Sequence, residues 1–147
     1  MAEPGHAVKV TVLTFLVAGI PAPQGSKTAW IVGRRAVLFD SNAKKLQPWR
    51  AAVAGAAQAA HAARAPLEGA LYVDVQFRFV RPKTVRRLWP SVRPDVDKLA
   101  RGLLDALTVA AVWGDDAQVV DLHATKIYAA EPGAFVRVGQ INEKEKT

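Results

Sequence analysis

The sequence predicts an α+β fold in which two main helices cover a mixed β-sheet, all within one domain spanning residues 1–147. Residues 71–79 and 117–128 alternate between apolar and polar side chains, as half-buried strands do. Residues 48–63 are rich in alanine, and residues 97–107 carry regularly spaced leucines, so both segments favour helix. Strands and helices do not follow strict βαβ alternation, which favours a mixed sheet over a parallel one.

The N-terminal part predicts a strand and then a hairpin. Residues 8–17 are rich in Val, Leu, Phe and Thr, and the alternation slips near Val12 and Leu13, which indicates a bulge or burial on both faces. Glycines and prolines make residues 19–27 a loop. Two apolar segments, 29–32 and 35–39, flank Gly33 and Arg34 and predict a hairpin.

The remaining elements follow in order along the chain. A helix can begin at Ser41, and Pro48 predicts either a break or a new first turn in it. The alanines of residues 48–63 let this helix pack closely on the sheet. A last short strand is expected at residues 135–138, and the chain ends, residues 1–7 and 142–147, are expected to be frayed.

Composition narrows the possible functions. There is no cysteine, so disulfides, thiolate metal sites and cysteine nucleophiles are excluded, and three scattered histidines argue against a histidine-rich zinc site. The net charge of +7 favours a polyanionic partner, and nucleic acid is the leading candidate. Residues 10–20 form the longest apolar run, which is too short to span a bilayer and does not resemble a signal peptide. A cytoplasmic protein with no membrane partner is therefore expected.

Carboxylates gather in one short stretch of this basic chain. Asp95 and Asp97 stand at the expected entrance of the helix 97–107, and Asp116 follows that helix after a turn at Gly114. A helix and a returning turn can bring Asp116 back to the first pair. Oxygen ligands without a nitrogen or sulfur cluster suit Mg²⁺, for which Mn²⁺ can substitute. A metal-bound water beside a nucleic-acid phosphate would allow phosphodiester cleavage.

Basic and aromatic residues lie next to these acids. Arg101 is one helical turn beyond Asp97, either as a surface ion pair or as a phosphate contact. Strand parity places Lys126 on an apolar face, either as a snorkelling side chain or as a phosphate contact. The loop 81–93 contains no acid. The expected DNA-binding residues are Lys27, Arg81, Lys83, Arg86, Arg87, Trp89, Arg93 and Lys126.

Each acid also has a purely structural interpretation. Aspartates are common at helix starts, where they cap free N–H groups and complement the helix dipole. An Asp-Asp pair after Trp113-Gly114 is also a common turn, with Trp113 expected to be buried behind it. Taken together beside a basic loop, the acids favour a metal site.

The order of the motif blocks resembles the RusA family of Holliday junction resolvases. The blocks are residues 93–99 (RPDVDKL), 104–107 (LDAL) and 113–120 (WGDDAQVV), and the loop 19–27 is similar to that of phage members. The resemblance implies a small Mg²⁺-dependent homodimer that cuts four-way DNA junctions.

The family's functional residues map onto individual positions of this chain. The resemblance implies that Asp95, Asp97 and Asp116 bind the metal and that Asp115 is an adjoining acid in a supporting position. A functional lysine of the family falls on Arg101, which is a departure. Arginine keeps the charge and can brace a phosphate, but it is a poor proton donor.

The leading hypothesis is therefore a metal-dependent, structure-selective endodeoxyribonuclease, active in recombination, in DNA repair or in debranching phage DNA, within a bacterial or phage-infected cell. Its catalytic residues would be Asp95, Asp97, Asp116 and Arg101. The first alternative is a branched nucleic-acid-binding protein without catalysis, whose acids only cap a helix. The second is a different Mg²⁺ enzyme, such as a phosphatase or a nucleotidyl transferase.

Overall fold

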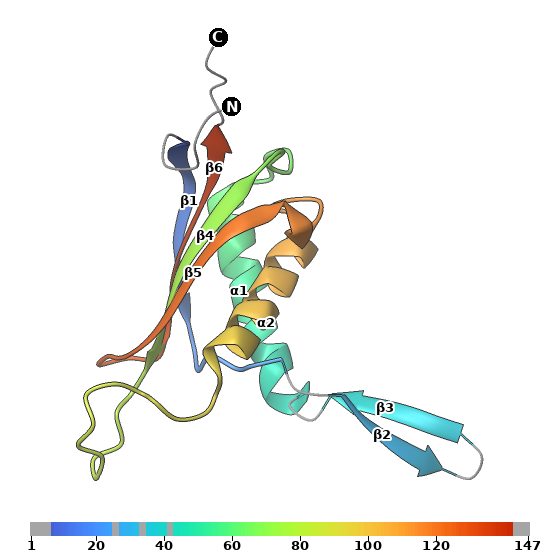
Figure 1. The fold of residues 1–147 in the computed structure, drawn as a ribbon, viewed down its shortest axis with the longest axis vertical. Helices are drawn as coiled ribbons and strands as arrows, with labels where there is room; N and C mark the ends of the chain where they lie inside the picture. Colours follow the sequence, from blue (N-terminus) through green and yellow to red (C-terminus); the bar gives the residue numbers. More distant parts are fainter. Residues whose placement is uncertain (1–6, 25–26, 33–34, 41–42, 143–147) are drawn as a thin grey trace.

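The computed structural model describes residues 7–24, 27–32, 35–40 and 43–142, with the backbone alone described at 27–32, 35–40 and 43. Six strands, two α-helices and a short 3-10 helix follow one another along these residues (Figure 1). Their bounds are β1 Val8–Ala18, β2 Lys27–Val32, β3 Arg35–Asp40, α1 Ala43–His61, β4 Leu71–Phe79, α2 Val96–Val109, η2 Asp116–Gln118, β5 Val119–Tyr128 and β6 Gly133–Asn142.

Four strands form the main sheet in the order β1-β6-β4-β5. Both helices lie on the same face of this sheet (Figure 1). The hydrophobic core fills the space between the helices and the sheet. Every second residue of β4 is buried there, from Leu71 to Phe77, and β1 and β6 contribute in the same way. The predicted α+β fold with a mixed sheet under two helices is confirmed, because β4 pairs antiparallel with β6 and parallel with β5.

The parallel pairing makes β4, α2 and β5 one strand–helix–strand unit. The first residue of β5, Val119, pairs with the first residue of β4, Leu71, and Tyr128 pairs with Phe79 at the other end. A helix that connects two parallel strands must run back along the sheet, against both of them. The entrance of α2 therefore lies at the C-terminal end of β4, and the exit of α2 lies at the opposite end of the sheet (Figure 1).

Strand β1 contains the predicted irregularity. Its register against β6 shifts between Thr11 and Leu13, so the expected bulge is confirmed. β1 and β6 approach each other closely: a Cβ atom placed on Gly139 would lie 2.2 Å from the carbonyl oxygen of Val10. Glycine at this position is therefore required by the close contact of the two backbones.

The predicted hairpin is confirmed in its two strands, since β2 and β3 pair antiparallel from Lys27 with Asp40 to Val32 with Arg35. Its turn residues 33–34, and Ser41 as a helix start, lie outside the described residues. The ribbon projects away from the main sheet (Figure 1). A two-stranded sheet is marginal on its own in water.

Two sequence predictions are wrong in detail. No break occurs at Pro48, which lies inside α1, since the helix is described without interruption from Ala43 to His61. The last strand, β6, runs over residues 133–142 and is much longer than the predicted 135–138. The predicted frayed ends fall on residues of which only Ala7 and Asn142 are described, and Asn142 ends β6. Neither of the two described helices has both the length and the apolar character needed to cross a membrane.

Candidate active site

The entrance of α2 presents the first two aspartates. Asp95 is the N-cap of α2 with an extended backbone, φ −72° and ψ 138°, and it follows a cis peptide bond between Arg93 and Pro94. Its carboxylate makes no capping hydrogen bond, so the purely structural role expected of an N-cap acid is not fulfilled here. The Lys98 ammonium lies 3.8 Å from that carboxylate.

Asp97 lies in the first turn of α2, and its side chain is exposed. Within the described residues it takes part in no side-chain hydrogen bond or salt bridge. Arg101, one turn further on, is exposed as well, and the two are not joined in an ion pair anywhere in this described part of the chain. The Asp97 carboxylate and this guanidinium therefore remain available to a ligand, whereas the exposed Asp95 carboxylate has its contact with Lys98.

Lys126 holds the segment that leads into α2. Its Nζ atom donates hydrogen bonds to the carbonyl oxygens of Val92, at 2.7 Å, and Pro94, at 2.8 Å. The ammonium thus ties β5 to the residues directly before Asp95. The strand parity predicted from the sequence is correct, since Lys126 pairs with the buried Phe77, but this positioning contact was not foreseen.

Asp115 and Asp116 differ in what their side chains do. Asp115 is the N-cap of η2 and accepts a hydrogen bond from the Ala117 amide at 2.9 Å. Gln118 completes a capping box by accepting from the amides of Gly114 and Asp115, and it donates to the carbonyl oxygens of Leu67 and Gly69. Asp116 is exposed and takes no part in this capping network. Asp115 is thereby committed to the turn.

Trp113 lies behind this turn, as predicted. It is among the largest fully buried side chains of the described residues, and its Nε1 atom donates a hydrogen bond of 2.8 Å to the Thr108 hydroxyl. The turn that carries Asp116 is therefore anchored on both sides, by Trp113 in the core and by Gln118 at the surface.

The two groups of aspartates lie at opposite ends of α2. The fourteen residues of α2 rise about 21 Å at 1.5 Å per residue. The same separation follows along β5, because Lys126, which contacts the α2 entrance, is about 23 Å beyond Val119 at 3.3 Å per residue. In the described part of the chain no group of three His, Cys, Asp or Glu side chains is placed to hold a metal ion.

The expectation that a returning turn brings Asp116 back to Asp95 and Asp97 within one chain is therefore wrong. The physical reason is the parallel pairing of β4 and β5, which makes α2 a crossover helix with its two ends far apart. The assignment of these aspartates as metal ligands is a separate matter and stays a prediction.

The basic loop 81–93 is largely exposed next to the α2 entrance. Trp89 is 63% exposed, and Leu88 is 77% exposed, so the loop presents apolar as well as cationic groups. Arg87 donates to the Tyr128 hydroxyl at 3.0 Å, which links the loop to the end of β5. The exposed cations of the loop are Arg81, Lys83, Arg86, Arg87 and Arg93. The side chain of Lys27, at the start of β2, lies outside the described residues.

Comparison with known proteins supplies the family. The family model described as "Endodeoxyribonuclease RusA" matches residues 21–139, which include both groups of aspartates and the basic loop. The chain belongs to the RusA endodeoxyribonuclease family. A protein of Bacillus subtilis strain 168 named "Uncharacterized protein YqaN" is 29% identical over 143 residues, covering 88% of this chain and 97% of its own length. The RusA resemblance found in the motif blocks is thus confirmed.

Proposed function

We propose that this RusA-family chain is a divalent-metal-dependent endonuclease that resolves four-way DNA junctions by paired symmetric nicks, and that it acts as a homodimer. Family membership places it among endodeoxyribonucleases. The exposed carboxylates of Asp95, Asp97 and Asp116 and the basic loop beside the α2 entrance support the metal and the branched DNA. The setting would be recombination, repair or phage DNA debranching in the cytoplasm of a bacterial or phage-infected cell.

The separation of the aspartates is the observation that carries the homodimer. Mg²⁺ takes its oxygen ligands at about 2.0–2.1 Å, so acids about 20 Å apart cannot share one ion within a single chain. A twofold axis between two copies repeats each contact on both sides. An arrangement that sets the α2 entrance of one chain against η2 of the other would complete two equivalent sites at once.

Each proposed site would then contain Asp95 and Asp97 of one chain and Asp116 of the partner subunit. Their chemistry fits a hard cation, because all three are carboxylates, and the side chain of Asp95 makes no cap bond. When bound, the metal would lower the pKa of a water nucleophile and stabilise the charge that develops on the scissile phosphate.

The remaining residues would bind and orient the DNA. Arg101 is exposed one turn beyond Asp97 and would brace the phosphate through its guanidinium. A guanidinium is a poor proton donor, so a proton on the leaving oxygen would come from water. The cations of the loop 81–93, with Lys27, would contact backbone phosphates, and Trp89 would stack on an unpaired base. Lys126 would hold the metal-binding entrance in position.

Nicking of a four-way junction tests the proposal. The full-length protein is incubated with a junction and with the matching linear duplex, in Mg²⁺, in Mn²⁺ and in chelator. We expect paired nicks in the junction with either metal and none with chelator. Asp97→Asn should lower the rate by more than about a hundredfold, since even the loss of an outer partner of a metal ligand typically costs about 10- to 100-fold.

Asp105→Asn is the matched control, because it removes the same charge from the same helix. Asp105 is not among the proposed metal ligands and pairs instead with Arg50 of α1, at 3.0 Å. Its nicking rate should stay near that of the unmodified protein. Junction binding that is indifferent to metal and never produces nicks would instead support the non-catalytic binding protein. Turnover of a small phosphorylated substrate without nicking would support the other Mg²⁺ enzymes.

A further inference from the structure

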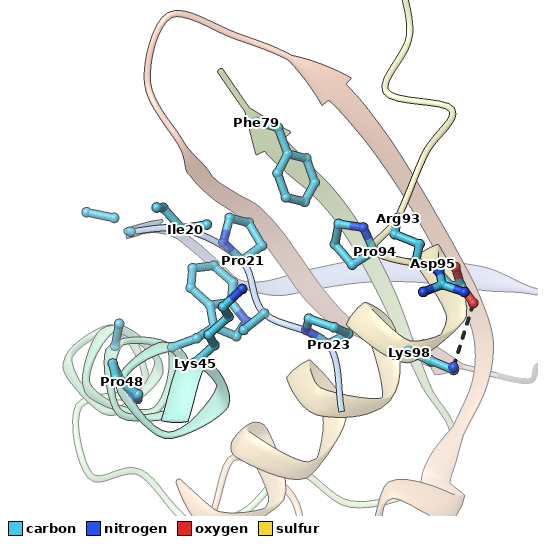
Figure 2. Close-up of a pocket in the computed structure, with 15 residues that line it drawn as sticks. Ile20, Pro21, Pro23, Lys45, Pro48, Phe79, Arg93, Pro94, Asp95 and Lys98 are labelled. Atoms are coloured by element: carbon cyan, nitrogen blue, oxygen red, sulfur yellow. Dashed lines mark ion pairs between the residues drawn. The ribbon is translucent and has the colours of Figure 1, made fainter. Parts of the chain in front are cut away.

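A cavity of about 1080 Å³ lies directly beside the α2 entrance (Figure 2). Four separate segments line it: residues 18–23 at the end of β1 and in the loop that follows, the first half of α1, the end of β4 at Phe79, and residues 93–98. Its volume is just above the range of about 300–1,000 Å³ that is typical of small-molecule sites. The cavity therefore has room for a group much larger than a metal ion and its waters.

The lining of the cavity combines an apolar wall with a cationic rim. Phe79, Pro21 and Pro94 lie around the hollow, with Lys45 on one side and Arg93 and Lys98 on the other (Figure 2). Trp49 and Pro48 of α1 add to the apolar wall. A ligand that suits this lining has a flat apolar body and a negative charge near one edge.

The backbone of α2 adds to the preference for an anion. Asp95 does not cap the helix with its side chain, and the first backbone bond within the helix is from the Leu99 amide to the Asp95 carbonyl. The amides of the first turn thus point out of the helix without an intrahelical partner, at its positive end. Arg93 and Lys98 lie on this side of the cavity, where the Asp95 carboxylate is 3.8 Å from the Lys98 ammonium, and Lys45 faces them from the other side. The three cations outnumber the one carboxylate, so the rim and the free amides together suit a phosphate.

We infer that this cavity receives an unpaired nucleobase of the bound DNA, from the branch point next to the scissile phosphate, while its flanking phosphate lies on the cationic rim. This inference rests on the proposed function and names how the site selects its substrate. A base in a linear duplex must be unstacked and unpaired before it can enter, and this cost is least where pairing is already interrupted. The cavity would therefore favour branched over linear DNA at the same site that cuts it.

The test is a cycle that couples one protein change to one DNA change. Phe79→Leu keeps an apolar side chain at the end of β4 but removes the aromatic face. In the DNA, the nucleotide that adjoins the mapped cleavage position is replaced by an abasic residue. Loss of base–aromatic stacking should weaken junction binding about 5- to 10-fold in either single change. The double change should be no worse than either single one, because both remove the same contact.

Junction binding is measured in chelator and tests the cavity inference. Nicking is measured in Mg²⁺ and tests the nuclease proposal, so either one can fail without the other. Phe135→Leu is the matched protein control, since Phe135 is a half-buried phenylalanine of β6 that does not line the cavity. Lys45→Ala, compared with Lys44→Ala, tests the rim: both are exposed lysines at the start of α1, and only Lys45 lines the cavity.

On the intact junction, we expect Lys45→Ala to weaken binding more than Lys44→Ala does. On the abasic junction, the two variants should weaken binding to the same extent. Additive losses in the cycle would overturn the inference, as would equal effects of Phe79→Leu and Phe135→Leu. Binding of a free nucleoside monophosphate that is lost in Phe79→Leu but does not weaken junction binding would also overturn it, because the cavity would then accept a separate small molecule.

Discussion

Two adjacent aspartates, Asp115 and Asp116, show how position decides the role of a carboxylate. The first accepts the Ala117 amide and caps η2, whereas the second takes no part in the cap. The spacing of the residues could not say which of the two caps the turn, because either residue of an Asp-Asp pair can do so. The structure assigns the cap to the first, since Gln118 closes the capping box around it.

Replacing Asp115 should therefore lower stability, whereas replacing Asp116 should lower activity. Asp115→Ala removes an N-cap and should lower the free energy of unfolding by about 1 kcal/mol. Asp116→Asn should leave the denaturant midpoint nearly unchanged but lower Mg²⁺-dependent nicking by more than about a hundredfold, as for a lost metal ligand. Urea unfolding and junction nicking of both variants measure this. A stable and fully active Asp116→Asn protein would exclude Asp116 from the site.

At the scale of elements, periodicity predicted most of the helices and strands. Strand β4 was predicted with its observed bounds, and the bulge of β1 was visible as a slip in the alternation. The pairing of strands was not predictable in the same way, because it depends on contacts between distant segments. The parallel pairing of β4 and β5 was missed, and with it the consequence that the ends of α2 are about 20 Å apart.

Lys126 joins two of these elements, and its replacement should disturb the site without touching a metal ligand. Lys126→Met removes both hydrogen bonds to the segment before Asp95, at the carbonyls of Val92 and Pro94. We expect the Mg²⁺ concentration for half-maximal nicking to rise several-fold, because the entrance is no longer held in place. Lys9→Met, which removes an exposed pair with Asp121 on the other edge strand, should leave that concentration unchanged. Equal effects of the two variants would contradict the positioning role.

At the scale of the whole molecule, one chain presents two incomplete groups of acids at opposite ends of its crossover helix. A four-way junction offers two equivalent strands, and a twofold dimer offers two equivalent sites to them. The proposed dimer thus accounts for the distant aspartates and for paired nicks with a single arrangement. A site shared between two chains also predicts a result that a site within one chain does not.

Asp97→Asn and Asp116→Asn are each expected to be inactive, but a mixture of the two should regain activity once subunits have exchanged. In a mixed dimer, one shared site has both substitutions, while the other contains the intact Asp95 and Asp97 of one chain and the intact Asp116 of the other. Nicking of one strand should return, with at most half of the sites restored. If each site belonged to one chain, every site in the mixed dimer would still lack an aspartate, and no mixing ratio would recover nicking.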